Sequence, residues 1–143
     1  TMCYNYTRGV KRMAYLKYKE LTKYFNFFEE LDMDKLPEYV TDYIFPHEKI
    51  IGAYRTSRDK GIFTDRKMLL FDVTPFSRTK QIHTIPYNSI STIAILFKGP
   101  TARILVYVDS GYPLTLKFVG LTAKEKTKLR IMYNEICKKV VDR

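Results

Sequence analysis

The stretch from Ile50 to Val119 constrains the fold most, because apolar residues alternate with polar ones there in short segments divided by turn residues. In the segment 67–73, for example, every second side chain is apolar, as expected of a strand with one face on a core. Seven such segments follow one another: 50–57, 62–64, 67–73, 78–85, 90–97, 103–109 and 114–119. No segment long enough for a crossover helix lies between them, so neighbouring strands are expected to pair antiparallel.

A single amphipathic helix is expected after the strands, from Thr122 to about Val141. Thr122 and Glu125 have the spacing of a capping box, in which each side chain pairs with a backbone amide of the first turn. The apolar residues that follow recur at helical spacing: Leu129, Met132, Tyr133, Ile136 and Val140. We therefore predict an α+β, mainly β fold, with about seven antiparallel strands in a bent barrel and a helix that caps it.

Helices are also predicted before the strands. Apolar residues at spacings of four and three place one helix over about residues 10–31, with the stripe Ala14, Tyr18, Leu21, Phe25 and Phe28. A second, short helix is expected between Pro37 and Pro46 and should pack on the edge of the strand unit. The predicted division is an N-terminal helix with an acidic joint, residues 1–35, and a domain over residues 36–143.

The net charge of +10 is concentrated in the strand and helix unit. Residues 1–48 hold seven basic and eight acidic side chains, giving −1, whereas residues 49–143 hold eighteen and seven, giving +11. Such an excess attracts anionic partners, although charge runs often serve only solubility. Cys3 and Cys137 have no metal or disulfide spacing, and the apolar runs are far shorter than the roughly 20 residues of a membrane helix. A cytoplasmic protein is expected.

Enzymatic chemistry has no support in the sequence. His47 and His83 stand alone, the glycines form no phosphate-binding loop, and no nucleophile motif is present. The carboxylates that lie close together, Glu29, Glu30, Asp32 and Asp34, fall in an acidic joint where nothing would desolvate them. We predict a protein that is not an enzyme, with no metal, no cofactor and no small-molecule substrate.

Several segments of the chain resemble those of a known family. They are LPEYVTDYI, PHEKII, GIFTDRKMLLFD and IPYNSISTI, followed by two hairpin strands and a terminal helix. From Leu36 to about Val141 the chain resembles the bacterial pleckstrin-homology domains. The resemblance implies a bent seven-stranded barrel with a C-terminal cap helix. These motifs hold turn and core residues, so they indicate the fold and not a ligand.

Basic residues near the first hairpin are one candidate site. Eukaryotic relatives of the fold that bind inositol phosphates do so with basic residues in this region. The corresponding cations here are Arg55, Arg58, Lys60, Arg66, Lys67, Arg78 and Lys80. They predict a patch for an anionic membrane surface or a phosphorylated ligand, with solvated charges as the alternative.

A second candidate site is the aromatic group Tyr24, Phe25, Phe27 and Phe28 of the predicted N-terminal helix. Its apolar surface would serve protein association or self-assembly, unless the helix packs on its own barrel. Nucleic acid is a further alternative, because Tyr54, Tyr87, Tyr107 and Tyr112 lie on or near strands of a basic chain. A non-catalytic module for protein association, or a homo-oligomer, is the leading hypothesis.

Overall fold

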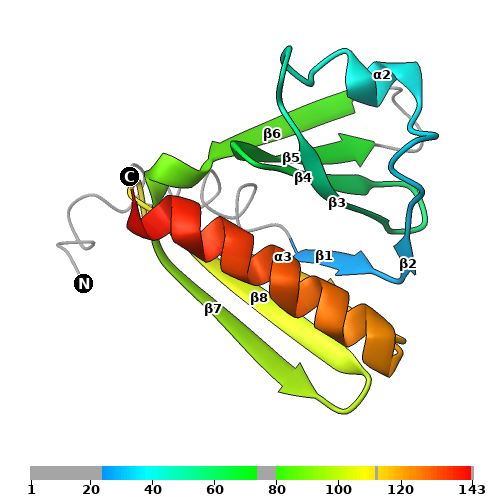
Figure 1. Cartoon of the computed structure of the whole chain (residues 1–143), viewed down its shortest axis with the longest axis vertical. Helices are drawn as coiled ribbons and strands as arrows, with labels where there is room; N and C mark the ends of the chain where they lie inside the picture. The colour runs from blue at the N-terminus through cyan, green and yellow to red at the C-terminus, as the bar shows by residue number, and fades with distance from the viewer. Residues whose placement is uncertain (1–23, 74–79, 112, 143) are drawn as a thin grey trace, which may run out of the picture.

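The computed structural model describes residues 24–73, 80–111 and 113–142 and contains two β-sheets with a long helix beside them (Figure 1). The five-stranded sheet has the order β2-β3-β4-β5-β6, and the four-stranded sheet has the order β1-β9-β8-β7. The first sheet is formed by Glu29–Glu30 (β2), Ile50–Arg55 (β3), Lys60–Thr64 (β4), Lys67–Val73 (β5) and Lys80–Pro86 (β6). The second is formed by Tyr24–Phe27 (β1), Ile90–Lys98 (β7), Thr101–Val108 (β8) and Pro113–Phe118 (β9). The helical elements are Glu38–Thr41 (α2), the 3₁₀ turn Tyr87–Ser89 (η1) and Ala123–Val141 (α3).

The seven strands predicted between Ile50 and Val119 are confirmed as β3 to β9, and those of the seven that are neighbours within a sheet pair antiparallel as expected. Their closure into a barrel is wrong. Among the described residues β6 and β7 share no hydrogen-bonded ladder, because η1 turns the chain from one sheet to the other between them. The two sheets instead face each other, and α3 lies along the opening between them (Figure 1).

The predicted N-terminal helix is wrong over residues 24–31. Tyr24–Phe27 forms β1, which pairs parallel with β9 and places Phe25 opposite Leu116 and Phe27 opposite Phe118. Glu29–Glu30 forms β2, which pairs with β3. The chain therefore passes from one sheet to the other within residues 27–29. The rest of that predicted helix, residues 10–23, lies outside the described residues.

Aromatic side chains fill the space between the sheets. Phe27 and Phe118 have ring centroids 5.3 Å apart, and Tyr54 lies edge-on to Phe118 at 4.9 Å. The α3 stripe enters the same core, because Leu129, Met132 and Ile136 are buried. Each fully buried large apolar side chain contributes about 1.5–3 kcal/mol of transfer free energy, so this cluster is a main source of the stability of the fold.

The short helix α2 covers the outer face of the five-stranded sheet, not its edge. Val40 of α2 is fully buried against Ala53, Ile62, Leu69 and Phe71, which point outward from β3, β4 and β5. The central strands of this sheet are thus covered on both faces. β5 shows this directly, since six of its seven residues are buried, Lys67 and Asp72 among them.

The capping box of α3 is confirmed. Thr122 Oγ1 accepts from the amide of Glu125 at 3.1 Å, and the amide of Thr122 donates to Glu125 Oε1 at 2.9 Å. Gly99, in the β7–β8 turn, has a positive φ of 57°, which a glycine adopts without steric cost.

Candidate functional site

The basic residues at the start of the five-stranded sheet contact groups of the same chain. Arg55 Nε lies 2.5 Å from Glu29 Oε1, and its guanidinium lies 5.0 Å from the ring centroid of Phe28. Lys60 Nζ donates to the Tyr39 hydroxyl at 2.7 Å. Arg55 thus fastens β2 to β3, and Lys60 fastens α2 to β4.

Lys67 lies inside the protein. Its side chain is 5% exposed and its ammonium group lies 2.7 Å from Oε1 of Glu48, whose side chain is fully buried. The ring centroid of Phe45 lies 3.4 Å from the same nitrogen. Lys67 is therefore held by the loop before β3 and presents no charge at the surface.

The remaining predicted cations are dispersed. Arg58 is exposed in the β3–β4 turn, with Nε 4.0 Å from Asp59, and Arg66 is exposed in the β4–β5 turn at the other end of these strands. Lys80 begins β6, and Arg78 lies outside the described residues. The structure does not bring the five described side chains to one surface.

The predicted aromatic group is divided by the strand geometry of β1. Phe25 and Phe27 are each 1% exposed and belong to the core, whereas Phe28 is 47% exposed beneath Arg55. Alternate residues of a strand point to opposite faces, which the helical interpretation could not reproduce. Tyr24 is the first residue of β1.

Two tyrosines that were candidates for base stacking are also buried. Tyr54 is 5% exposed and Tyr87 is 2% exposed, and the Tyr87 hydroxyl donates to the carbonyl of Thr64 at 2.7 Å. Burial raises the pKa of both phenols well above the ordinary value. Tyr107 is 44% exposed, and Tyr112 lies outside the described residues.

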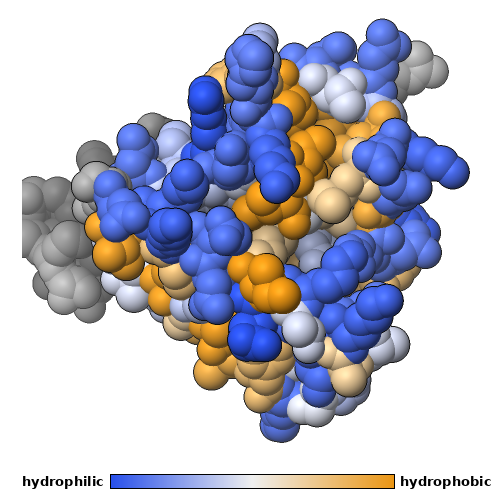
Figure 2. Space-filling view, viewed as in Figure 1, coloured by the Kyte–Doolittle hydropathy of each residue, from blue (hydrophilic) through white to orange (hydrophobic). Residues whose placement is uncertain are grey.

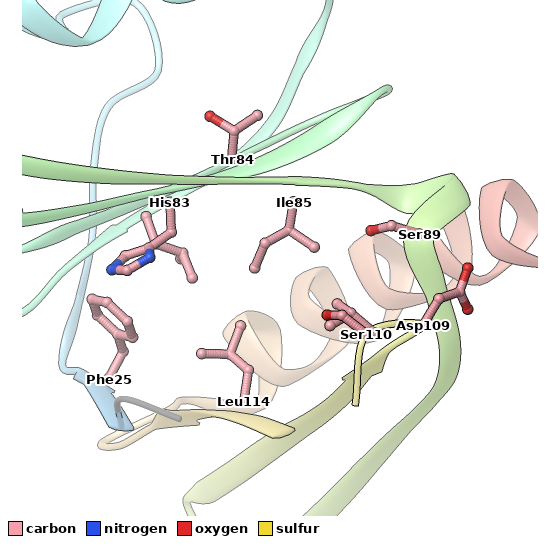
Figure 3. A pocket seen from close by; sticks show the side chains of 10 residues that line it. Phe25, His83, Thr84, Ile85, Ser89, Asp109, Ser110 and Leu114 are labelled. Atoms are coloured by element: carbon pink, nitrogen blue, oxygen red, sulfur yellow. The ribbon is translucent and has the colours of Figure 1, made fainter. Parts of the chain in front are cut away.

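A pocket of about 490 Å³ opens between the sheets. Figure 3 shows His83 and Ile85 pointing from β6 into the pocket, toward Phe25 and Leu114 of the other sheet. Its wall combines apolar side chains with polar ones, among them His83, Ser89, Asp109 and Ser110. The sequence could not reveal this pocket, because its residues come from five separate strands, from η1 and from the β8–β9 turn, and meet only when the two sheets face each other.

The edge of the four-stranded sheet is a further surface that the sequence analysis did not single out as a site. β7 is nine residues long and, among the described strands, pairs only with β8. Leu96 and Phe97 are 53% and 43% exposed. Figure 2 shows hydrophobic surface following β7 along the lower edge of the view. The apolar run from Ile93 to Phe97 is the signal that could have identified it.

Metal and membrane-spanning features are not found in the part of the chain that the structure describes. No three His, Cys, Asp or Glu side chains lie close enough together there to hold a metal ion. None of the described helices has both the length and the apolar character that a membrane crossing requires.

The profile of the bacterial PH domain family matches residues 21–101, which is more than half of the chain. The chain belongs to the bacterial PH domain family. The resemblance seen in the sequence is thereby confirmed. The matched region begins before residue 36, so it includes β1 and β2, both of which are hydrogen-bonded into the sheets. PH domains are generally non-catalytic binding modules.

Solved structures with this fold include three bacterial proteins. A DUF1696 family protein with a pleckstrin-homology domain from Shewanella loihica PV-4 has a TM-score of 0.62 at 20% identity, covering 78% of this chain and 95% of that one. A PH-domain-containing protein from Exiguobacterium sibiricum 255-15 has a TM-score of 0.60 at 15% identity, covering 78% of this chain but only 60% of that one. The pleckstrin-homology domain from Shewanella amazonensis SB2B has a TM-score of 0.54 at 19% identity, covering 77% and 89%. At these identities the likeness concerns the fold alone, and no curated protein matches the chain.

Proposed function

We propose that this bacterial PH domain is a non-catalytic binding module that associates with protein through the β7 edge of its four-stranded sheet. The observation that carries the proposal is the length and composition of β7. It has nine residues, and none of them is charged before Lys98 at its end. Natural edge strands are usually short, charged or interrupted by proline, because an open edge invites pairing with another chain.

The other described edges are better protected than β7. β1 has four residues and β2 has two, and β6 ends in Pro86. β7 has a register shift between Ile90 and Thr92, after which its pairing with β8 is regular up to Lys98. The Ile93 carbonyl accepts from the Tyr133 hydroxyl at 3.2 Å, so at least one backbone group on β7 has a partner from outside the sheet.

Addition of a strand to such an edge is a common mode of protein recognition, with backbone hydrogen bonds for affinity and side-chain contacts for specificity. A second copy of the chain is the partner we favour. If two β7 strands pair antiparallel about a centre near Ala94, Lys98 of each copy lies beside Ile90 of the other copy, and the two lysines are far apart. Asp109 follows β8 and lies opposite Ser89, next to the Ile90 end of β7. The two ends of the β7 edge therefore differ in charge.

A lysine at Ala94 should weaken this association by about tenfold or more, because twofold pairing would place the two new charges side by side. Leu105 of β8 has Ala94 opposite it in β7 and Thr115 opposite it in β9. Thr115→Lys therefore adds the same charge to the same face, but inside the sheet. Light scattering on a size-exclusion column, over a range of protein concentrations, measures the effect. A chain that stays monomeric at every concentration, or equal weakening by both variants, would contradict self-association through β7.

A further inference from the structure

Three cations lie on the outer face of the four-stranded sheet: Lys98, Arg103 and Lys117. Arg103 is directly opposite Lys117 on one side and Leu96 on the other. Their neighbours in sequence, Ala102, Ile104, Leu116 and Phe118, are buried in the core, so by strand alternation these cations point outward. Like charges directly opposite each other are destabilising in a sheet. The fold tolerates this pair without a neutralising partner on the same strands.

The four strands contain no acidic residue at all. Within the described residues, no carboxylate lies within ion-pair distance of Lys98, Arg103 or Lys117. Some cations elsewhere are neutralised locally, since Arg55, Lys67 and Lys128 each pair with a glutamate. The outer face holds three cations and no acidic residue on its strands, so it is a local concentration of positive charge.

Leu96, opposite Arg103, projects on the same face as these cations near the tip of the β7–β8 hairpin, whereas Phe97, opposite the buried Ala102, lies on the other face of the hairpin. Leu96 is 53% and Phe97 43% exposed, and a Cβ placed on Gly99 in the turn would meet no atom within 4 Å. Figure 1 shows the hairpin extending away from the five-stranded sheet. Lys126 of α3 reaches the turn, where its Nζ donates to the carbonyl of Gly99 at 3.1 Å. An open concavity of about 720 Å³ is lined by Leu96, Lys98, Arg103 and Lys117 among others.

We propose that the β7–β8 hairpin and the adjoining outer sheet face dock on the surface of an anionic phospholipid bilayer. The negative surface potential of such a membrane attracts clustered lysines and arginines. Leu96, which projects from this face, enters the boundary of the acyl chains, while the long basic side chains keep their charged ends among the headgroups. A soluble acidic peptide would neutralise the cations but would leave the exposed Leu96 without an apolar partner, so the bilayer fits the whole surface better.

The test is sedimentation of the full chain with phosphatidylcholine vesicles that contain or lack phosphatidylserine. We expect binding only to the anionic vesicles, decreasing as salt rises. Replacing both cations of the opposed pair, Arg103→Gln with Lys117→Gln, should lower the partition coefficient about twenty-fivefold, since each surface cation contributes about a fivefold factor. The control is Lys138→Gln with Lys139→Gln, which removes the same charge from exposed positions in the last turn of α3. It should lower binding only a few-fold.

Leu96→Ser tests the apolar part of the surface. It should reduce binding to the anionic vesicles severalfold while leaving the net charge unchanged. Equal losses in the cation variant and its control would overturn the proposal, as would full binding by Leu96→Ser. Binding to soluble polyglutamate without binding to vesicles would also overturn it, in favour of an acidic protein partner. Thermal unfolding of each variant confirms that it is folded.

The membrane proposal is independent of the association proposed for β7. Ala94→Lys should weaken strand pairing, but it adds a cation to the outer face and should retain or strengthen vesicle binding. Loss of self-association with vesicle binding intact would therefore separate the two surfaces. Failure of one proposal can be recognised while the other stands.

Discussion

Phe27→Ala should lower the free energy of unfolding by about 3–5 kcal/mol, the usual loss when a buried aromatic ring is removed from a core. The ring is 1% exposed and contacts Phe118, with centroids 5.3 Å apart. It also closes over Gly61 of β4, where a Cβ would lie 2.5 Å from Phe27 Cζ. β1 thus contributes a central part of the core, although it has only four residues. Urea unfolding followed by circular dichroism measures the loss.

Phe28→Ala is the matched control, because the neighbouring ring is 47% exposed and lies under Arg55. It should change stability by less than about 1 kcal/mol. The strand arrangement also predicts a large loss for Phe25→Ala, since Phe25 shares the inward face with Phe27. A helix would group Phe25 with Phe28 instead. Large losses for Phe25→Ala and Phe28→Ala, with little effect of Phe27→Ala, would show that β1 is wrongly assigned.

The contrast between β1 and the other strands shows what local sequence can determine. β3 to β9 were predicted because strands that pair in the sheets are also neighbours in the sequence, so pairing and alternation agree along the chain. The capping box of α3 is equally local. β1 pairs instead with β9, about ninety residues later, and its four residues are too few to separate a period of two from one of 3.6. The spacing of Phe25 and Phe28 therefore favoured a helix.

The candidate sites show the same limit. Charge can be counted from the sequence, but whether a lysine reaches the surface depends on partners from distant segments. Lys67 was predicted as part of a basic patch, yet it is held inside by Glu48, a residue from the loop before β3. Conversely, the cations of the outer sheet face became notable only through the register that places Arg103 opposite Lys117. The sequence alone could not show that register.

Breaking the buried pair of Glu48 and Lys67 should be the other large effect on stability. Glu48 Oε1 accepts from Lys67 Nζ at 2.7 Å and from the amide of Phe45 at 2.8 Å, and its other oxygen accepts from the Thr64 hydroxyl. Glu48→Gln or Lys67→Met would each leave the remaining charge buried without its partner. Each should lower the free energy of unfolding by about 3–5 kcal/mol. Urea unfolding at neutral pH is the measurement.

The double variant Glu48→Leu with Lys67→Met is the control for this explanation. It removes both charges together, so its loss should be clearly smaller than the sum of the two single losses. Replacement of a buried ion pair by apolar side chains can even be neutral. Losses that simply add would mean that the two residues stabilise the fold through separate contacts, and not as a pair.

Acidification should lower the free energy of unfolding through protonation of the Glu48 carboxylate. Burial by itself raises the pKa of Glu48, but the hydrogen bonds from Lys67, Thr64 and Phe45 and the charge of Lys67 outweigh it, so the pKa lies below the ordinary value. A carboxyl whose pKa is lower in the folded state stabilises the fold above its unfolded pKa of about 4.3, and this stabilisation is lost as pH falls through the folded value. The free energy of unfolding should therefore decrease with acidification below that pH. Glu48→Gln cannot titrate here, so its unfolding should depend less on pH. If the free energy of unfolding falls equally with decreasing pH in the variant and in the unchanged chain, other carboxylates cause the acid sensitivity.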